Sequence, residues 1–358
     1  MKNKLNELKE KGVPVYSFSK LNSFNNCEYE YYNTYVLKNR GIDNIYTIMG
    51  TTIHEGIEGI YDQTKDINKF KEEFENKLME SELVGVTFPN EKIGDSWKAD
   101  NRHFLENFNK LDTKIIQEKL IVFEIAEGIW LQGYIDGILP SDKGKPYVHV
   151  NDWKTSSKFA GKKLTESGRQ LLMYKVGLEK VSNFKVDRLT WFMVKYIYVC
   201  NTQKNKKVKK KMCNRGKWVK DMRKQLEKDL LGLGIEEFEI EILLDAAVKN
   251  NNIKELPQQV QNKYWIEDCF VEYEATEERI EELINYVINT VAAINNKNPG
   301  DEKEWKPREI TQFDSFYCST LCGHRKTCKF YKEFLDKNSD KFKKKDKDDE
   351  FSFDNLFS

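Results

Sequence analysis

The sequence predicts a mixed α/β fold of the α+β kind, and two observations support this class. Residues 119–154 contain three short runs rich in β-branched and aromatic residues, which is the pattern of a β-meander. The periodicity then becomes that of a helix over 162–181 and that of a buried strand over 188–200. We therefore expect a central mixed sheet flanked by helices.

Each expected element has its own local signal. The segments before the meander have helical spacing or dense charge, and we expect helices over 16–38, 50–63 and 67–118. Gly128 and the turn PSDKGKP separate the three runs of the meander, which gives strands over 119–125, 129–139 and 147–154. A further helix is expected over 275–296.

Four parts follow one another along the chain. We expect the N-terminal helices and the core over 1–200, an inserted basic and helical region over 201–300, a cysteine segment that packs on the N-terminal helices over 301–335, and a disordered charged tail over 336–358.

Composition and the absence of certain motifs exclude several classes of protein. The 358 residues can bury a large core, and a net charge of +1 gives no global argument for a nucleic-acid partner. The sequence has no long apolar run, no apolar signal-peptide stretch and no GxxxxGK[ST] phosphate loop. We expect a cytoplasmic protein that has no membrane partner and no motor of its own. Its thiols would stay reduced, so a dense cysteine cluster favours metal over disulfides.

The strongest local signal is a pair of carboxylates in the second hairpin. If this hairpin folds symmetrically about Gly144, Asp136 lies opposite Asp152, and opposed residues have Cβ atoms about 4.5–5.5 Å apart on one face. The strand period places Lys154 on that face too. Two such carboxylates repel each other, and Mg²⁺ or Mn²⁺ between them removes the repulsion. The alternative is an ordinary surface hairpin with an Asp/Lys pair, since a slip of one residue would destroy the register.

The arrangement Asp136, then Asp152-Trp153-Lys154, resembles the PD-(D/E)XK nuclease superfamily and specifically its RecB-like branch. The resemblance covers about residues 16–200 and the segment near 320. Ile135 stands where the superfamily's name has proline, and an apolar residue is tolerated there in the branch.

This resemblance implies a restriction-endonuclease-like core and assigns roles to further residues. His54, in GTTIHEGIE, would complete the metal site with Asp136 and Asp152, and Glu58 could orient its ring. Gln170 and Tyr174, four apart in QLLMY, would bind near the substrate. Each residue also has an ordinary structural explanation, such as packing in the core or at a helix–sheet seam.

The segment CSTLCGHRKTC brings three cysteines together with a C-x3-C-x5-C spacing. The resemblance implies that Cys27 joins Cys318, Cys322 and Cys328 around a [4Fe–4S] cluster. The branch more often has C-x2-C-x5-C, so tetrahedral Zn²⁺, with Cys27 or His324 as fourth ligand, stays an alternative. Three further cysteines are expected in the core or on the surface: Cys200, Cys213 and Cys269.

A basic run, 204–224, could follow phosphates, with Trp218 stacking on a base, or it could be a solvated loop. The acidic, aromatic tail could dock a partner protein or stay inert. The expected function is a Mg²⁺- or Mn²⁺-dependent DNA exonuclease that acts on ends or single strands in recombination, repair or phage DNA metabolism, with a helicase or single-strand-binding protein as partner. The alternatives are a silent DNA-binding scaffold subunit and a CRISPR-adaptation-type nuclease, which could also cut RNA.

Overall fold

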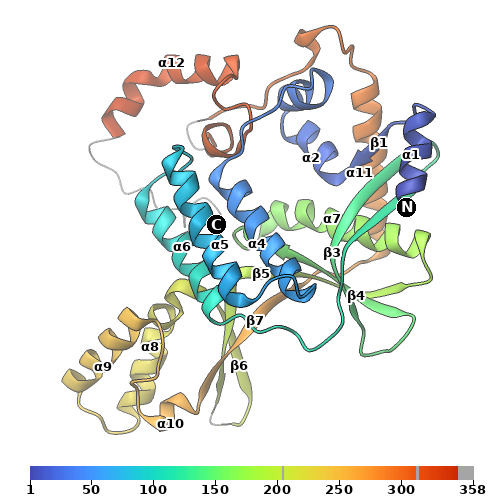
Figure 1. Cartoon of the computed structure of the whole chain (residues 1–358). Helices are drawn as coiled ribbons and strands as arrows, with labels where there is room; N and C mark the ends of the chain where they lie inside the picture. The colour runs from blue at the N-terminus through green and yellow to red at the C-terminus, as the bar shows by residue number, and fades with distance from the viewer. Residues whose placement is uncertain (204, 312–313, 346–358) are drawn as a thin grey trace.

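The computed structural model describes residues 1–203, 205–311 and 314–345, and its elements surround one mixed sheet (Figure 1). The strands are β1 (Val15–Ser17), β2 (Ile116–Ala126), β3 (Ile129–Pro140), β4 (Tyr147–Lys154), β5 (Lys185–Thr202), β6 (Val208–Asn214) and β7 (Tyr264–Glu272). The α-helices are α1 (Lys2–Glu10), α2 (Phe18–Asn26), α3 (Glu28–Tyr31), α4 (Ile45–Tyr61), α5 (Ile67–Leu83), α6 (Glu91–Glu106), α7 (Gly161–Val181), α8 (Trp218–Leu231), α9 (Glu237–Asn250), α10 (Gln258–Gln261), α11 (Glu277–Asn295) and α12 (Lys329–Lys345). Short π- or 3-10 helices are η1 (Tyr32–Val36), η2 (Arg215–Lys217), η3 (Glu302–Glu304) and η4 (Tyr317–Leu321).

The predicted meander forms the middle of the sheet. β2 pairs antiparallel with β3, and β3 pairs antiparallel with β4. The α7 crossover then places β5 parallel to β4, while β6 and β7 run antiparallel to β5 and β1 lies parallel to β3. This mixed sheet confirms the predicted fold class.

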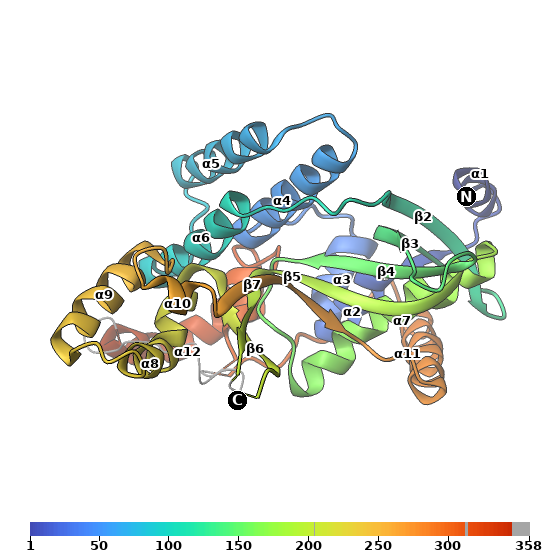
Figure 2. The same cartoon turned by 90° about the horizontal axis from the view of Figure 1, so that it is seen from below.

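Two helical layers cover the sheet (Figure 2). Helices α2, α7 and α11 pack on one face in the main hydrophobic core, and helices α4 to α6 pack on the other face in a second core. The first layer lies very close to the sheet, because a Cβ at Gly177 of α7 would come within 2.4 Å of the Phe123 ring. Only glycine permits this approach.

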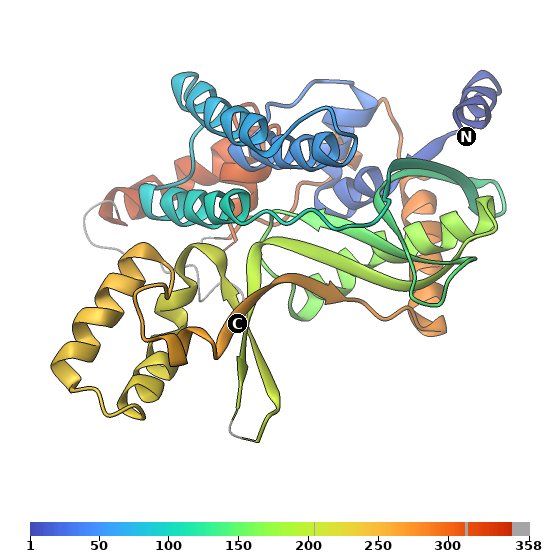
Figure 3. The same ribbon diagram turned by 60° about the horizontal axis from the view of Figure 1, so that its bottom comes forward.

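The region expected as an insertion is divided in the structure. Its two strands, β6 and β7, belong to the central sheet, and α11 packs on the main core. Only α8, α9 and α10 form an outer module, which shares a separate core with the distal part of β5 (Figure 3). Trp218 is 5% exposed in that core, so the prediction that it stacks on a base is wrong.

The cysteine segment contacts the N-terminal part of the chain. Ile42 N–H donates to Gly323 O at 2.9 Å, and Asn44 Nδ2 donates to Leu321 O at 3.0 Å. Gly41 and Gly323 touch through their backbones, since a Cβ at Gly41 would lie 3.0 Å from Gly323 Cα. Asn44 also caps α4 through Thr47 N–H, so this contact positions the helix that carries His54.

Several boundaries differ from the prediction. The helical stretch expected over 16–38 begins at Phe18, after β1, and β2 begins at Ile116, inside the stretch expected as helical over 67–118. Helix α12 continues through 336–345, which were expected in the charged tail. The rest of that tail, 346–358, lies outside the described residues. No helix in the described part of the chain is long and apolar enough to span a bilayer.

Candidate active site

The β3–β4 hairpin has the predicted register. Gly137 pairs with Asn151 and Leu139 with His149, so that each pair is equidistant from Gly144. This register places Asp136 opposite Asp152, just beyond the last pair of the ladder. The Trp153 N–H donates to Asp136 Oδ2 at 2.9 Å, which ties the two strand ends together at the carboxylates.

Helix α4 brings a histidine to this end of the hairpin. Ile53 and Ile57 are buried on the face of α4 that packs against the sheet, and His54 lies beside that face. The His54 Nδ1 atom lies 3.5 Å from Asp136 Oδ2. Burial lowers the pKa of His54, although the Asp152 charge opposes this effect, and the neutral imidazole is the form that binds metals.

On the other side, α7 supplies a hydrogen-bond chain to the lysine. Lys154 Nζ lies 2.7 Å from Asp152 Oδ2 and donates to Gln170 Oε1 at 3.0 Å. Gln170 Nε2 in turn donates to the Tyr174 hydroxyl at 2.8 Å. The structure therefore brings all six residues predicted for this site together at the end of one hairpin.

The site holds negative charge in a poorly solvated place. Burial, and then repulsion from Asp152, raise the pKa of Asp136 well above its usual range, and Lys154 offsets this effect only in part. Burial also raises the pKa of Tyr174, and both aspartates add to the shift. The site therefore favours a cation or a proton between its carboxylates.

A divalent cation fits this set of donors. The side chain of Asp152 is 2% exposed, and beyond its ion pair with Lys154 its Oδ2 has no hydrogen-bond partner among the described residues. Two carboxylates and a neutral imidazole are ligands suited to Mg²⁺ or Mn²⁺. The described residues contain no preassembled group of three or more His, Cys, Asp or Glu ligands, so binding would require the side chains to close around the ion.

A third carboxylate, Glu118, was not predicted. β2 pairs Gln117 with Gly137 and Lys119 with Ile135, which places Glu118 opposite Asp136. Glu118 lines an open groove of about 500 Å³ together with residues of α4, namely Gly50, Thr51, His54, Glu55 and Glu58. Burial, and then Glu58, raise the pKa of Glu118. Folding the first hairpin about its turn glycine, Gly128, would have placed Leu120 opposite Asp136, whereas most of the observed pairs are symmetric about residue 127.

The backbone is irregular where these two carboxylates meet. Glu118 has φ of +46°, in the left-handed region that disfavours any residue with a Cβ. A Cβ at Gly133 would meet Met173 of α7, whereas a Cβ at Gly137 would meet Trp153 in the opposite layer. In a regular strand, residues 133 and 137 would face the same side of the sheet. Because they face opposite sides, the alternation of side-chain direction along β3 breaks between them, in the stretch that contains Asp136.

The expected partnership between Glu58 and His54 has no hydrogen bond to support it among the described residues. The backbone carbonyl of Glu58 accepts from Gln117 Nε2 at 3.2 Å and from the Asp62 N–H at 2.9 Å. Glu58 belongs instead to the groove that Glu118 lines.

The four cysteines of the predicted cluster lie near one another, without forming a preassembled group of ligands within the described residues. Cys27, Cys318, Cys322 and Cys328 line one pocket. Two of the sulfurs accept backbone hydrogen bonds at 3.4 Å, Cys27 from the Arg308 N–H and Cys322 from the N–H two residues on. Burial raises the pKa of Cys318 to about 12, so without a metal this thiol stays protonated.

The pocket also contains Tyr317 and Glu30, which the sequence did not assign, and His324, the alternative Zn²⁺ ligand. Tyr317 donates to Glu30 at 2.5 Å. His324 is buried and its Nε2 lies 2.9 Å from Thr34 Oγ1, while burial lowers its pKa. The remaining cysteines are buried elsewhere, consistent with the core assignment: Cys200, Cys213 and Cys269.

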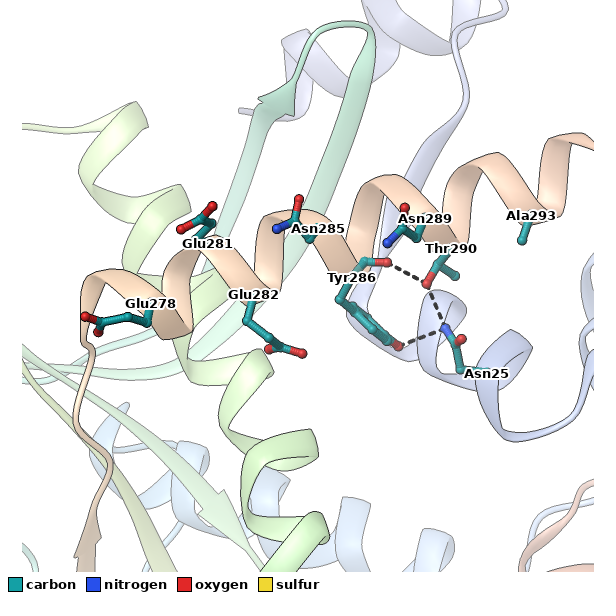
Figure 4. Close-up of a pocket in the computed structure, with 9 residues that line it drawn as sticks. All are labelled: Asn25, Glu278, Glu281, Glu282, Asn285, Tyr286, Asn289, Thr290 and Ala293. Atoms are coloured by element: carbon teal, nitrogen blue, oxygen red, sulfur yellow. Dashed lines mark hydrogen bonds between the residues drawn. The ribbon is translucent and has the colours of Figure 1, made fainter.

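A separate groove of about 520 Å³ runs along α11 (Figure 4). Asn25 closes one end, where its Nδ2 donates to the Tyr286 hydroxyl at 3.1 Å and to Thr290 Oγ1 at 2.9 Å. Its other end is acidic, with Glu278, Glu281 and Glu282. None of the predicted site residues lines this groove.

A mixed sheet whose hairpin ends in two carboxylates and a lysine is the architecture of a nuclease core. The family model of the PD-(D/E)XK nuclease superfamily matches residues 15–329. The chain therefore belongs to this superfamily, whose members are nucleases that act on DNA and generally use Mg²⁺ or Mn²⁺. No curated protein matches the chain.

Proposed function

We propose that the chain is a Mg²⁺- or Mn²⁺-dependent exonuclease that hydrolyses phosphodiester bonds at DNA ends or in single strands. The observation that carries the proposal is the meeting of His54, Asp136, Asp152 and Lys154, which come from three different elements. A catalytically silent scaffold would not need all four residues in one place, so this convergence disfavours that alternative.

His54, Asp136 and Asp152 would hold the metal ion, with the Trp153 carbonyl as a further ligand. The ion supplies charge stabilisation for the pentavalent phosphate. Lys154 would hold the attacking water, because its Nζ lies beside Asp152 at the same end of the hairpin. Gln170 and Tyr174 keep the ammonium group directed there through their hydrogen-bond chain, close to the path of the substrate.

We propose that Glu118 holds a water of the same site. Its position opposite Asp136 and its place in the groove beside His54 support this role. Strained backbone at a residue with a side chain is often kept for function.

The four cysteines would hold a [4Fe–4S] cluster that binds the C-terminal segment to the N-terminal helices. Their common pocket and the two N–H···S hydrogen bonds support thiolate ligation. Zn²⁺ is the second candidate, with Cys27 as fourth ligand, because the Nε2 of His324 is engaged with Thr34.

We propose that the enzyme works in the cytoplasm, in recombination, repair or phage DNA metabolism, together with a helicase or single-strand-binding protein. The described chain divides into a nuclease core, the α8–α10 module and the cysteine segment. A CRISPR-adaptation nuclease would use the same site residues. The cleavage products would therefore distinguish that role from recombination, repair or phage DNA metabolism.

The test is cleavage of end-labelled single- and double-stranded DNA by anaerobically purified protein with Mg²⁺, Mn²⁺ or EDTA. Lys154→Ala should abolish metal-dependent cleavage, while Lys162→Ala, at an exposed lysine 93% accessible, should keep it. Mononucleotides released from the label would identify an exonuclease. DNA binding without cleavage in any metal would instead support the scaffold.

A further inference from the structure

Strands β5 and β6 form a hairpin, called the ribbon below, whose tip projects from the body of the protein (Figure 3). Strand β7 pairs with the other edge of β5 along the same stretch. The ribbon runs from the pair Tyr196–Asn214 to the pair Thr202–Val208. It carries lysines along β6 and at its tip: Lys206, Lys207, Lys209, Lys210 and Lys211. The distal end of β5, in the same sheet that holds the active site, therefore lies beside a concentrated positive charge.

Part of this charge is already used within the protein. Lys210 pairs with Glu267 at 2.5 Å, and Lys211 Nζ donates to the Asp221 carbonyl at 2.6 Å. The other three, Lys206, Lys207 and Lys209, are exposed and have no ion pair within the described ranges. These three lysines are free to bind an anionic partner.

The ribbon also offers apolar and aromatic surface next to the charge. Val208 is 50% exposed near the tip. Trp265 of β7 and Lys210 of β6 both pair with Cys200, one on each side of β5, and Trp265 is 37% exposed. Lysines with an exposed aromatic neighbour suit a nucleic-acid backbone and its sugars.

The distance from the active site is set by β5 itself. Lys154 pairs with Met193, and β5 continues nine residues further to Thr202. At about 3.3 Å per residue the ribbon reaches at most about 30 Å from the site. That length corresponds to about nine base pairs of duplex DNA.

We propose that the β5–β6 ribbon binds the backbone of duplex DNA, up to about nine base pairs from the phosphate that is cut. This inference rests on the proposed nuclease function and adds duplex DNA as the substrate that the enzyme holds. The three lysines Lys206, Lys207 and Lys209 lie at the exposed tip of the ribbon, and lysines bind phosphates without selecting a sequence. The contact gives the enzyme affinity for double-stranded flanks.

The first test measures binding and needs no cleavage. Duplex affinity is measured against salt concentration in EDTA, for the native chain and for a triple variant, Lys206→Gln, Lys207→Gln and Lys209→Gln. The slope of log K against log salt should fall by about 2.7, which is 0.9 for each lost phosphate contact. A control variant changes three exposed lysines elsewhere to glutamine, Lys9, Lys92 and Lys254, and should keep the slope.

The second test uses the reach of the ribbon. The triple variant should cut a 30-base-pair duplex with about tenfold or more lower kcat/KM at moderate salt, and cut a duplex of six base pairs like the native enzyme. Three results would each overturn the proposal. One is an unchanged salt slope for the triple variant. The others are an equal loss of kcat/KM on the short duplex or on single-stranded DNA of the same length as the long duplex. If no DNA is cut at all, the nuclease function fails, while the binding slope still tests the ribbon.

Discussion

Replacing Asp136 with asparagine should stabilise the metal-free protein while it abolishes cleavage. In the register of the hairpin, Asp136 and Asp152 face each other with Cβ atoms about 5 Å apart. Two charges at about 5 Å repel by roughly 3 kcal/mol at an effective dielectric constant of about 20. Lys154 beside Asp152 reduces this value, so we expect a gain of about 1–3 kcal/mol in the free energy of unfolding.

The sign of the effect follows from the direction of the pKa shift. The folded protein raises the pKa of Asp136 well above 3.8, so between the two values the folded state holds the proton more tightly than the unfolded chain. The stability of the metal-free native protein therefore falls as pH rises through that window. The asparagine variant lacks this titration, and its advantage should be largest on the alkaline side.

The assay is urea unfolding in EDTA and in saturating Mn²⁺, at pH 5 and pH 8. The native protein should gain about 2.7 kcal/mol at 100 times the metal dissociation constant, whereas Asp136→Asn should gain almost nothing. Asp142→Asn, in the exposed turn of the same hairpin, should behave like the native protein in both conditions. A variant that is less stable than the native protein in EDTA at pH 8 would refute the electrostatic reasoning.

Three further changes separate the other roles. Glu118→Gly should relieve the left-handed backbone and keep or raise the melting temperature, yet lower Mn²⁺ affinity and cleavage about tenfold; unchanged Mn²⁺ affinity would remove Glu118 from the site. Gln170→Ala should free the Lys154 ammonium group and lower kcat without changing DNA affinity, so an unchanged kcat would show that the hydrogen bond is incidental. Cys322→Ser should lose both stability and any brown iron–sulfur absorbance, whereas Cys269→Ser, buried in the main core, should lose stability and keep the colour.

Local patterns were sufficient to predict the central elements and the register of the second hairpin. The register was predicted by folding the hairpin symmetrically about Gly144, and the observed pairs Gly137–Asn151 and Leu139–His149 have this symmetry, which excludes the one-residue slip. The helix face that holds Gln170 and Tyr174 follows from spacing alone.

The remaining features depend on contacts between distant parts of the chain. Trp218 follows a basic run, and only the packing of the α8–α10 module on β5 shows that it is buried. Glu118 takes a left-handed conformation in the middle of a strand, which no local propensity favours. The meeting of Cys27 with the C-terminal cysteines likewise requires the complete fold.

The hydrogen bond between Asn44 and Leu321 has a consequence for folding during synthesis on the ribosome. The two residues are 277 positions apart, so the hydrogen bond that ties Asn44 to the cysteine segment can form only after 277 further residues have been synthesised. At about 5–20 residues per second, translation of that interval takes roughly 14–55 seconds. During this time α4, the helix that carries His54, lacks the hydrogen bond that ties its N-terminal cap to the cysteine segment. A nascent chain would therefore have the complete anchor of this helix only after Leu321 has been synthesised and has left the ribosome.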